Sequence, residues 1–303
     1  MKDFIEFCKR YIGPLLLASM LLGYFVPQFA VLKPLLPYLL TLMLYNSLLN
    51  IKLRPEHFFQ NKILLFPLLN WLILPLLIIF TYKIFQPSYQ IGLLITIITP
   101  TALGSPVITK LTNGKIELSM SFLLIFNMLA PFTYPILLWI YLSGVEISLP
   151  IGAILLRTAK IIFIPLIASM LTKQSPKILH FMQQKIAPIN TFLVIFLVTI
   201  VISSARTQIE ADTPLNLLVL FGYVLLICFI LYGVGYLFAG KDDLLKRTLP
   251  IALGHKNTGL AILVCVANFS AVAAIPAVLY IISHHIMNAM FIQYFRNDKR
   301  LTK

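Results

Sequence analysis

A histidine and a lysine stand side by side within a stretch that is otherwise typical of a membrane span. Residues 251–260 read IALGHKNTGL, with His255 and Lys256 at the centre. A charge near the middle of a bilayer costs at least roughly 2.5–3.5 kcal/mol, so an ionisable residue there indicates a functional site. Asn257 and Thr258 follow directly, and either is a suitable helix N-cap, so we expect a second helix to begin at this point.

The composition indicates a polytopic membrane protein. Of the 303 residues, 59% are hydrophobic and 11% are charged, against about 45–50% and about 25% in soluble domains. Ten apolar stretches approach the ~20 residues that cross a bilayer as a helix. They are residues 11–31, 34–51, 63–85, 89–111, 116–142, 151–171, 186–204, 215–238, 245–269 and 271–294. We therefore expect an all-α fold of ten transmembrane helices.

The net charge of +14 is explained by topology and not by nucleic-acid binding. Eighteen of the 24 Lys and Arg residues fall on one side of the ten predicted spans, and only Lys33, Lys83 and Arg206 fall on the other. Basic loops face the cytoplasm, so both termini of this cell (inner) membrane protein are expected there. Arg157 and Lys160 begin the sixth span, where anchoring at the membrane interface is a simpler reading than attraction of anions.

The three cysteines and the N-terminus add little to the functional reading. Cys8, Cys228 and Cys265 are too scattered for a disulfide framework or a zinc site, and we interpret them as small apolar fillers. The first span is longer than the core of a signal peptide and lacks a small-residue cleavage site, so we expect it to be retained.

The chain contains two signs of an internal repeat. The letters ASML occur at residues 18–21 and 168–171, and ALG occurs at 102–104 and 252–254, both at an offset of 150 residues. Each half, 1–150 and 151–303, would hold five spans, and an odd number inverts the second copy in the membrane. Inverted-topology repeats with substrate sites near the midplane are the construction of many secondary transporters.

The repeat also pairs two interrupted spans. The fourth span carries Pro100, Gly104 and Pro106, and the ninth carries Pro250, Gly254 and Gly259 at corresponding places. Proline removes an amide donor and clashes with the preceding turn, so neither span is expected to be one continuous helix. Broken helices at matching positions predict a binding site, although Pro and Gly also simply kink membrane helices.

These segments resemble the bile acid/sodium symporter family over the whole chain. GHKNTGLA is similar to the ninth-span signature, TPTALGSPVITKLTNGKIELS to the fourth-span crossover and its basic loop, NWLILP to a third-span pattern, and ISHHI to a His-Asn pair in span ten. The resemblance implies a core domain of spans 3–5 and 8–10, in which spans four and nine cross, and a panel domain of spans 1, 2, 6 and 7. This is the fold type of sodium/proton antiporters.

The resemblance also implies which residues stand at ion-binding positions. Two sodium ions in coupled members are held with help from a fourth-span Ser-Asn pair and a ninth-span Glu and Gln. Here Ser105 keeps the serine, Pro106 replaces the asparagine, Ala252 replaces the glutamate and Lys256 replaces the glutamine. The set of residues at positions equivalent to the ion site is completed by His255, by Asn70, which stands for a third-span glutamine, and by Ser119 at the end of the crossover segment. Sodium prefers oxygen ligands, and all ten acidic residues lie in loops or at span ends, which puts sodium coupling in doubt.

Two roles for Lys256 follow from this arrangement. Its ammonium would bond the carbonyls exposed at the helix breaks, in the place of a bound sodium ion, and leave the helix N-termini for an anion. Alternatively, Lys256 or His255 would lose and regain a proton during transport, so proton coupling stays open.

The remaining polar residues are candidates for substrate contact or for bonding a broken helix. The resemblance carries substrate contact to Ser105, Asn257, Thr258, His284 and His285. Adjacent residues on a helix are about 100° apart, so at most one of the two neighbouring histidines is expected to face the crossover squarely. No Asp, Glu or Cys is placed to complete a zinc site with them, so no metal is expected.

The sequence predicts a secondary transporter of an organic anion, working by alternating access and without a cofactor. Small carboxylic acids and amphipathic sterol acids both remain open as substrates, as does the oligomeric state. Sodium-independent transport is the main reading, and sodium coupling through a modified site is the alternative. A sodium/proton antiporter would need a membrane carboxylate. The sequence is also compatible with a non-transporting membrane sensor or an intramembrane metal enzyme.

Overall fold

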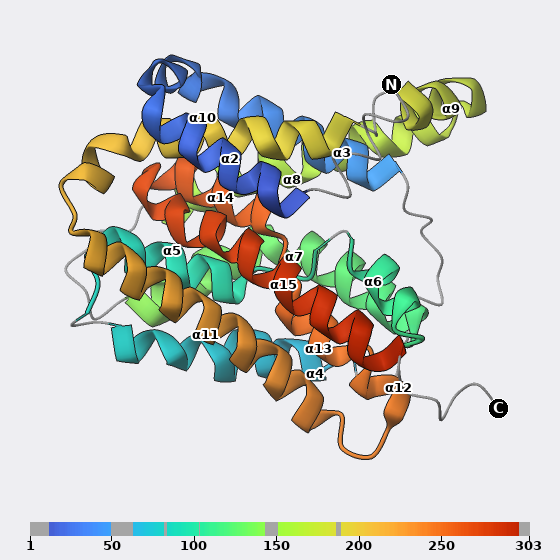
Figure 1. Cartoon of the computed structure of the whole chain (residues 1–303). Helices are drawn as coiled ribbons and strands as arrows, with labels where there is room; N and C mark the ends of the chain where they lie inside the picture. Colours follow the sequence, from blue (N-terminus) through green and yellow to red (C-terminus); the bar gives the residue numbers. More distant parts are fainter. Residues whose placement is uncertain are drawn as a thin grey trace.

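The computed structural model describes residues 12–49, 63–81, 84–102, 104–142, 151–185 and 189–296. These residues form helices and connecting turns (Figure 1). The helices, where η marks 3-10 or π geometry, are α2 (Ile12–Phe25), η1 (Pro27–Leu35), α3 (Leu36–Leu49), α4 (Leu65–Pro67), η3 (Leu68–Ile73), η4 (Leu74–Thr81), α5 (Pro87–Ile98), α6 (Ser105–Leu111), α7 (Ile116–Leu142), α8 (Ile151–Lys173), α9 (Pro176–Lys185), α10 (Asn190–Glu210), α11 (Pro214–Phe238), α12 (Asp243–Lys246), α13 (Leu249–Gly254), α14 (Thr258–Asn268), η6 (Val272–Ala274) and α15 (Ile275–Arg296). Predictions for Cys8, for the terminal basic residues and for the 2–3 loop lie outside the described residues.

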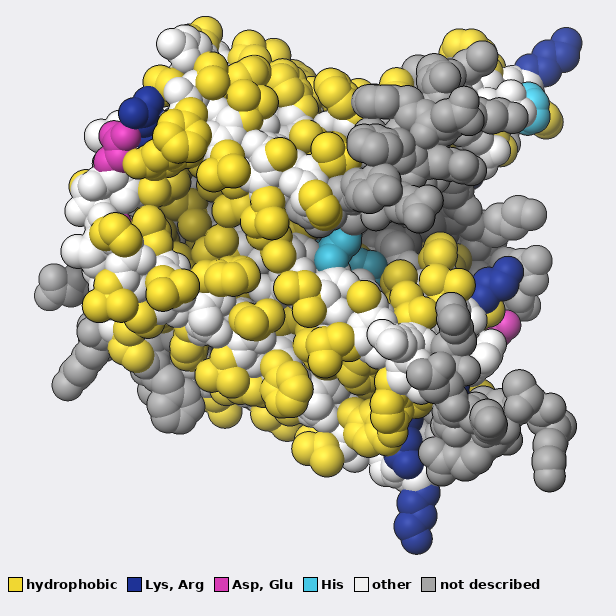
Figure 2. Space-filling model, in the orientation of Figure 1, with side chains coloured by type: hydrophobic (Ala, Val, Ile, Leu, Met, Phe, Trp, Pro, Cys, Tyr) yellow, Lys and Arg dark blue, Asp and Glu magenta, His cyan; other side chains and the backbone are white. Residues whose placement is uncertain are grey.

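The described helices are those of a polytopic membrane protein. Six are long and apolar enough to cross a bilayer, namely 27–49, 116–141, 152–173, 192–210, 214–238 and 272–295. Four shorter apolar helices, 14–25, 65–77, 87–98 and 258–268, overlap the other four predicted stretches, and the third of them begins two residues before the stretch 89–111. Figure 2 shows hydrophobic side chains spread over much of one face, as a surface in contact with lipid requires.

Two of the predicted spans are interrupted where the prolines and glycines predicted a break. The fourth stretch divides into α5 and α6, and the ninth divides into α13 and α14. Proline occupies one of the first two positions of α5, α6 and α13, where a missing amide donor is tolerated. Helix α14 begins at Thr258 with Asn257 as its N-cap, whose side chain accepts a hydrogen bond from the Leu260 amide at 3.3 Å.

The third predicted stretch is helical but irregular. It passes from α4 into a π-helical segment, η3, and then into the 3-10 segment η4. Pro75, near the start of η4, cannot donate to the helical ladder, so the regular hydrogen-bonding pattern changes around it. Asn70 lies within η3, fully buried. Short π segments often occur at functional sites because they redirect side chains.

Two boundaries predicted from the sequence were wrong. The second span begins at Pro27 and not at residue 34, because α2 ends at Phe25 and the chain enters η1 directly after Val26. Pro27 has no amide to continue α2, so the helix must end before it. The seventh stretch continues to Glu210 and not to residue 204. Arg206 and Glu210 form an ion pair of 2.7 Å in its last turns. Helix α9, within the predicted 6–7 loop, was not expected.

The helices can be described as two groups that also contact each other, since α7 packs against α8 and α14 packs against α3 and α8. In the first group, α10 lies against α2 and α3, α3 lies against α8, and α9 contacts α3 and α8. Helix α11 packs against α13 and α15, while α5 packs against α14, α15 and η6. In Figure 1, α2, α3 and α10 lie at the top of the view and α11 and α13 at the bottom, with α14 and α15 between them.

Candidate functional site

The two interrupted spans meet at their breaks. Thr101 and Lys256 form an isolated antiparallel bridge. The amide of Ala102 donates to the carbonyl of His255 at 2.7 Å, and the amide of Asn257 donates to the carbonyl of Pro100 at 2.9 Å. Backbone groups released by the breaks therefore bond each other, which satisfies buried donors and acceptors that no helix satisfies.

Lys256 is completely buried beside this bridge, and its ammonium is bonded to three oxygens. It donates to the carbonyl of Ile97 at 2.7 Å, to the carbonyl of Thr99 at 3.2 Å, and to the side-chain oxygen of Asn70. The first two carbonyls belong to the C-terminal end of α5, where helix carbonyls lack intrahelical donors and carry partial negative charge. An ammonium with three donors is matched by three acceptors.

Asn70 acts on the same helix end as the lysine. Its amide nitrogen donates to the carbonyl of Ile98 at 3.0 Å and to that of Thr99 at 3.4 Å, while its oxygen accepts from Lys256. The indole nitrogen of Trp71 also donates to the Ile98 carbonyl, at 3.0 Å. Side chains thus donate to the Ile97 and Ile98 carbonyls at the end of α5 and to the Thr99 carbonyl that follows it.

The end of α13 is satisfied in a similar way by neutral groups. The hydroxyl of Thr101 donates to the carbonyl of Ala252 at 2.7 Å, and the hydroxyl of Tyr280 donates to the carbonyl of Gly254 at 2.7 Å. Ala252 is fully buried and takes part through its backbone only. No carboxylate lies among these partners in the described part of the chain.

Asn127 of α7 joins both breaks. Its amide nitrogen donates to the carbonyl of Thr101 at 2.9 Å, and its oxygen accepts from the side-chain nitrogen of Asn257 at 2.8 Å. Asn257 also caps α14, so Asn127 positions the start of that half-helix.

Replacing Asn127 by leucine is expected to lower stability by about 1–3 kcal/mol, because the Thr101 carbonyl and the Asn257 amide lose buried partners. The measurement is the melting temperature of the purified variant. Thr96→Val is a matched control, since the buried Thr96 hydroxyl bonds only the Gly92 carbonyl of its own helix, at 2.7 Å. Equal melting temperatures for the two variants would contradict a linking role for Asn127.

The three predicted histidines lie together. The rings of His255 and His284 contact edge to face with centroids 4.7 Å apart, and the rings of His284 and His285 stack at 4.6 Å. His284 is 3% exposed, and its Nδ1 atom has no hydrogen-bond partner among the described residues. Of the two neighbouring histidines, His284 is the one whose ring contacts His255 at the crossover, in keeping with the angle between adjacent helix positions.

The fourth-span candidates are only partly joined to this group. The hydroxyl of Ser105 lies 3.3 Å from Nδ1 of His255 and donates to the His255 carbonyl at 3.4 Å. Ser119 is fully buried and accepts from the Thr109 hydroxyl at 3.1 Å. Pro106 is the second residue of α6 and is half-buried.

A cavity of about 380 Å³ opens beside the crossover. A water occupies about 30 Å³ in the liquid, so this volume equals that of roughly a dozen waters. Of the predicted residues it is lined by His255, Lys256, Asn257, Thr258, His284 and His285, and not by Asn70, Ala252, Ser105, Pro106 or Ser119. The opposite wall consists of α2, α3 and α10 and is mainly apolar, with Leu16, Leu40, Met43, Leu44, Val194 and Leu197.

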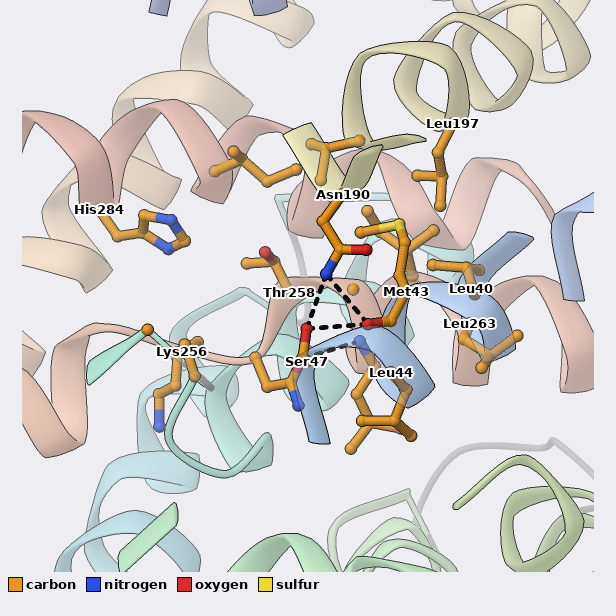
Figure 3. A pocket seen from close by; sticks show the side chains of 18 of the residues that line it. Leu40, Met43, Leu44, Ser47, Asn190, Leu197, Lys256, Thr258, Leu263 and His284 are labelled. Carbon is orange, nitrogen blue, oxygen red and sulfur yellow. Dashed lines mark hydrogen bonds between the residues drawn. The ribbon is translucent and has the colours of Figure 1, made fainter. Parts of the chain in front are cut away.

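Figure 3 shows this cavity from close by. Asn190, at the start of α10, donates from its side chain to the Ser47 hydroxyl at 2.9 Å and to the Met43 carbonyl at 3.2 Å. The Lys256 side chain points away from the cavity in this view, toward its carbonyl partners. Its Nζ atom is therefore bonded within the protein and is not the group nearest to the cavity.

Several residues of the site were missed by the sequence analysis. Asn127 is a lone amide in an apolar span, and a polar residue in such a place is itself a signal of a functional or structural role. Tyr280, Thr101 and Asn190 gave no comparable signal, because hydroxyls and helix-terminal amides are common in membrane helices. Within the described residues, no three His, Cys, Asp or Glu side chains form a group that could hold a metal ion.

Comparison with known proteins agrees with the family resemblance, and the family match contains the third- and fourth-span motifs but not those of spans nine and ten. The family model described as the sodium bile acid symporter family matches residues 37–212. The uncharacterized sodium-dependent transporter YocS of Bacillus subtilis (strain 168) is 24% identical over 215 residues, which are 68% of this chain and 64% of that relative. The match thus spans slightly less than two thirds of the relative's length. The family model covers more than half of this chain, and the chain belongs to the sodium bile acid symporter family, a family of membrane transporters and not of enzymes.

Proposed function

We propose that the protein carries an organic anion, either a small carboxylic acid or a bile-acid-like compound, across the membrane by alternating access. Family membership, the broken helices and the cavity beside them support this proposal. The substrate would bind at the start of α14, where helix amides carry roughly +0.5 of a charge. Asn257, Thr258 and His284 would contact it from this side, with His285 next to them and Ser105 holding His255.

The proposal includes the inverted repeat and the division into two domains. Residues 1–150 and 151–303 would each supply five of ten spans, and spans four and nine would cross at the Thr101–Lys256 bridge. The group α2, α3, α8 and α10 would form the panel, and α5, α6, α7, α11, α13, α14 and α15 would form most of the core. The packing of α10 on α2 and of α3 on α8 supports this division.

The main proposal for coupling is that Lys256 is a permanent internal cation. The observation that carries it is the ammonium bonded to the Ile97 and Thr99 carbonyls and to Asn70. Neutral oxygens of this kind are what a sodium ion would require as ligands. An ammonium that already occupies them leaves no need for sodium, and it supplies positive charge near a bound anion.

Sodium coupling through a modified site is the second candidate, and the comparisons favour it over the first. The name of the Bacillus relative describes that protein as sodium-dependent. Two buried serines remain near the fourth span, Ser105 at the start of α6 and Ser119 near the start of α7. These hydroxyls would be the remaining oxygen ligands for a cation in this version of the mechanism.

The two candidates predict different results in one ligand screen. The purified protein is heated with organic acids, including cholate, pyruvate and lactate, in sodium chloride or in choline chloride. On the main proposal, an acid that stabilises the protein gives the same shift of melting temperature in both salts, because Lys256 provides the charge. A shift that appears only with sodium would reject the main proposal in favour of the second candidate.

A further inference from the structure

The cavity is open at one end and closed at the other. Its lining begins with Ser47 near the end of α3, Asn190 at the start of α10 and His285 on α15. Along α10 it stops at Leu197, and along α14 it stops at Leu263. Histidine side chains are visible from outside in the space-filling view of Figure 2, within a recess. The lining residues thus lie toward the side that the basic loops predict to be cytoplasmic, and we take the open end to be there.

The closed end is formed by helices from both packing groups. Beyond Leu197, Ile200 and Val201 of α10 are completely buried, and α10 packs against η6. Helix α14 also ends here, at Asn268, beyond Leu263, the last of its residues that lines the cavity, and it contacts α8.

The C-terminal carbonyls of α14 need donors at this closed end. The Asn268 side chain donates to the Val264 carbonyl at 3.0 Å, and the Phe269 amide donates to the Cys265 carbonyl at 2.8 Å. The last turn of α14 contains no basic residue. The guanidinium of Arg157, on α8, donates to the Ala267 carbonyl at 2.8 Å. A cation at a helix C-terminus is stabilising, and here Arg157 of α8 supplies the cation that the last turn of α14 lacks.

We propose that Arg157 is a positioning residue for transport: its bond to the Ala267 carbonyl holds the panel helix α8 to the core half-helix α14 and stabilises the conformation whose cavity is open at the opposite end. The bond must break when the closed end opens, because α8 and α14 belong to the two parts that move relative to each other. This inference rests on the proposed function, since it requires alternating access.

The test measures how often the cavity faces each side of the membrane, and it needs no known substrate. Met43, which lines the cavity, is replaced by cysteine as a reporter. Cys8 is replaced by serine, while the native Cys228 and Cys265 are buried and remain. The rate of labelling by a membrane-impermeant thiol reagent is then measured from each side, in expressing cells and in inverted vesicles.

In this background, Arg157→Gln is expected to raise the labelling rate from the side of the closed end. The increase should be roughly two- to five-fold, the factor that a partly exposed charge at a helix end provides. Arg157→Lys should return the rate most of the way to that of the reporter alone, because an ammonium also donates to a carbonyl.

Arg206→Gln is the matched control. Arg206 pairs with Glu210 of its own helix and lies over the ring of Tyr24 on α2, so its contacts in the described residues stay within the panel group. Its labelling rate should equal that of the reporter alone. Equal rates in the Arg157 and Arg206 variants would reject the role of Arg157 while alternating access stands. Labelling of the reporter from one side only, in every variant, would reject alternating access and this inference with it.

Discussion

Lys256→Met is expected to lower stability by about 3–5 kcal/mol and to abolish transport. Methionine has nearly the length of lysine but no donor, so the Ile97 carbonyl, the Thr99 carbonyl and the Asn70 oxygen all lose a bonding partner at once. A buried acceptor without a partner costs about 1–3 kcal/mol. The Thr99 carbonyl keeps a long bond to Asn70, so the expected loss is smaller than the full cost of three unpaired acceptors. The measurements are the melting temperature and the uptake of a stabilising acid into proteoliposomes.

Lys256→Gln separates the loss of donors from the loss of charge. Glutamine restores a neutral oxygen and two donors at the position where the family resemblance implies a glutamine. If the carbonyls around Lys256 are a former sodium site, this variant should be stabilised by sodium chloride over choline chloride, while the unmodified protein should not. No sodium effect in Lys256→Gln would reject the view that the ammonium takes the place of a metal ion.

The charge that we propose for Lys256 would be tolerable because of where its partners come from. A buried charge without compensation is very costly, and no carboxylate lies beside this one in the described residues. The compensation comes from aligned backbone dipoles, since the C-terminal end of α5 carries partial negative charge. These oxygens reduce the cost of burial but do not cancel the net charge. An anion in the cavity would therefore meet a positive site, which is the electrostatic basis of the proposed substrate class.

The sequence predicted the breaks better than the bonds that stabilise them. Pro100, Pro106 and Gly254 mark the interruptions because proline and glycine act locally, through a missing donor or a missing side chain. The pairing of Lys256 with Asn70 was suggested only as two positions of one ion site. Their direct bond depends on the π segment η3, which no local pattern predicts.

Contacts between distant spans could not be obtained from one sequence. Asn127 joins Thr101 and Asn257 over 26 and 130 residues, and Arg157 reaches Ala267 over 110 residues. Such partners are set by the packing of whole helices. Many other polar side chains in membrane helices hydrogen-bond a carbonyl in the preceding turn of their own helix, and the sequence does not distinguish the two cases. The start of the second span was missed for a different reason, because Pro27 was read as lying within an apolar stretch and not as its boundary.

Gly254→Ala is expected to lower stability by about 3 kcal/mol and to abolish transport. Gly254 ends α13 directly before His255 and Lys256, and a Cβ atom there would lie 2.1 Å from two ring carbons of Tyr232. The ring cannot turn away easily, because Tyr232 is completely buried and its hydroxyl donates to Asn288 at 2.7 Å. Overpacking of this kind typically costs about 1–3 kcal/mol, and relief by moving the backbone would displace the lysine from its carbonyls.

Two further variants show whether the clash with Tyr232 is the cause. Gly222→Ala is the matched control, since a Cβ atom at Gly222 of α11 meets nothing within 4 Å, and its melting temperature and uptake should be unchanged. Tyr232→Ala alone should cost about 3–5 kcal/mol through the cavity it leaves. The double variant Gly254→Ala/Tyr232→Ala should be more stable than the sum of the single effects, because the added methyl group then has space. Strict additivity would show that Gly254 is needed for its backbone and not for the close approach of Tyr232, and the position of Lys256 would then depend on the turn itself.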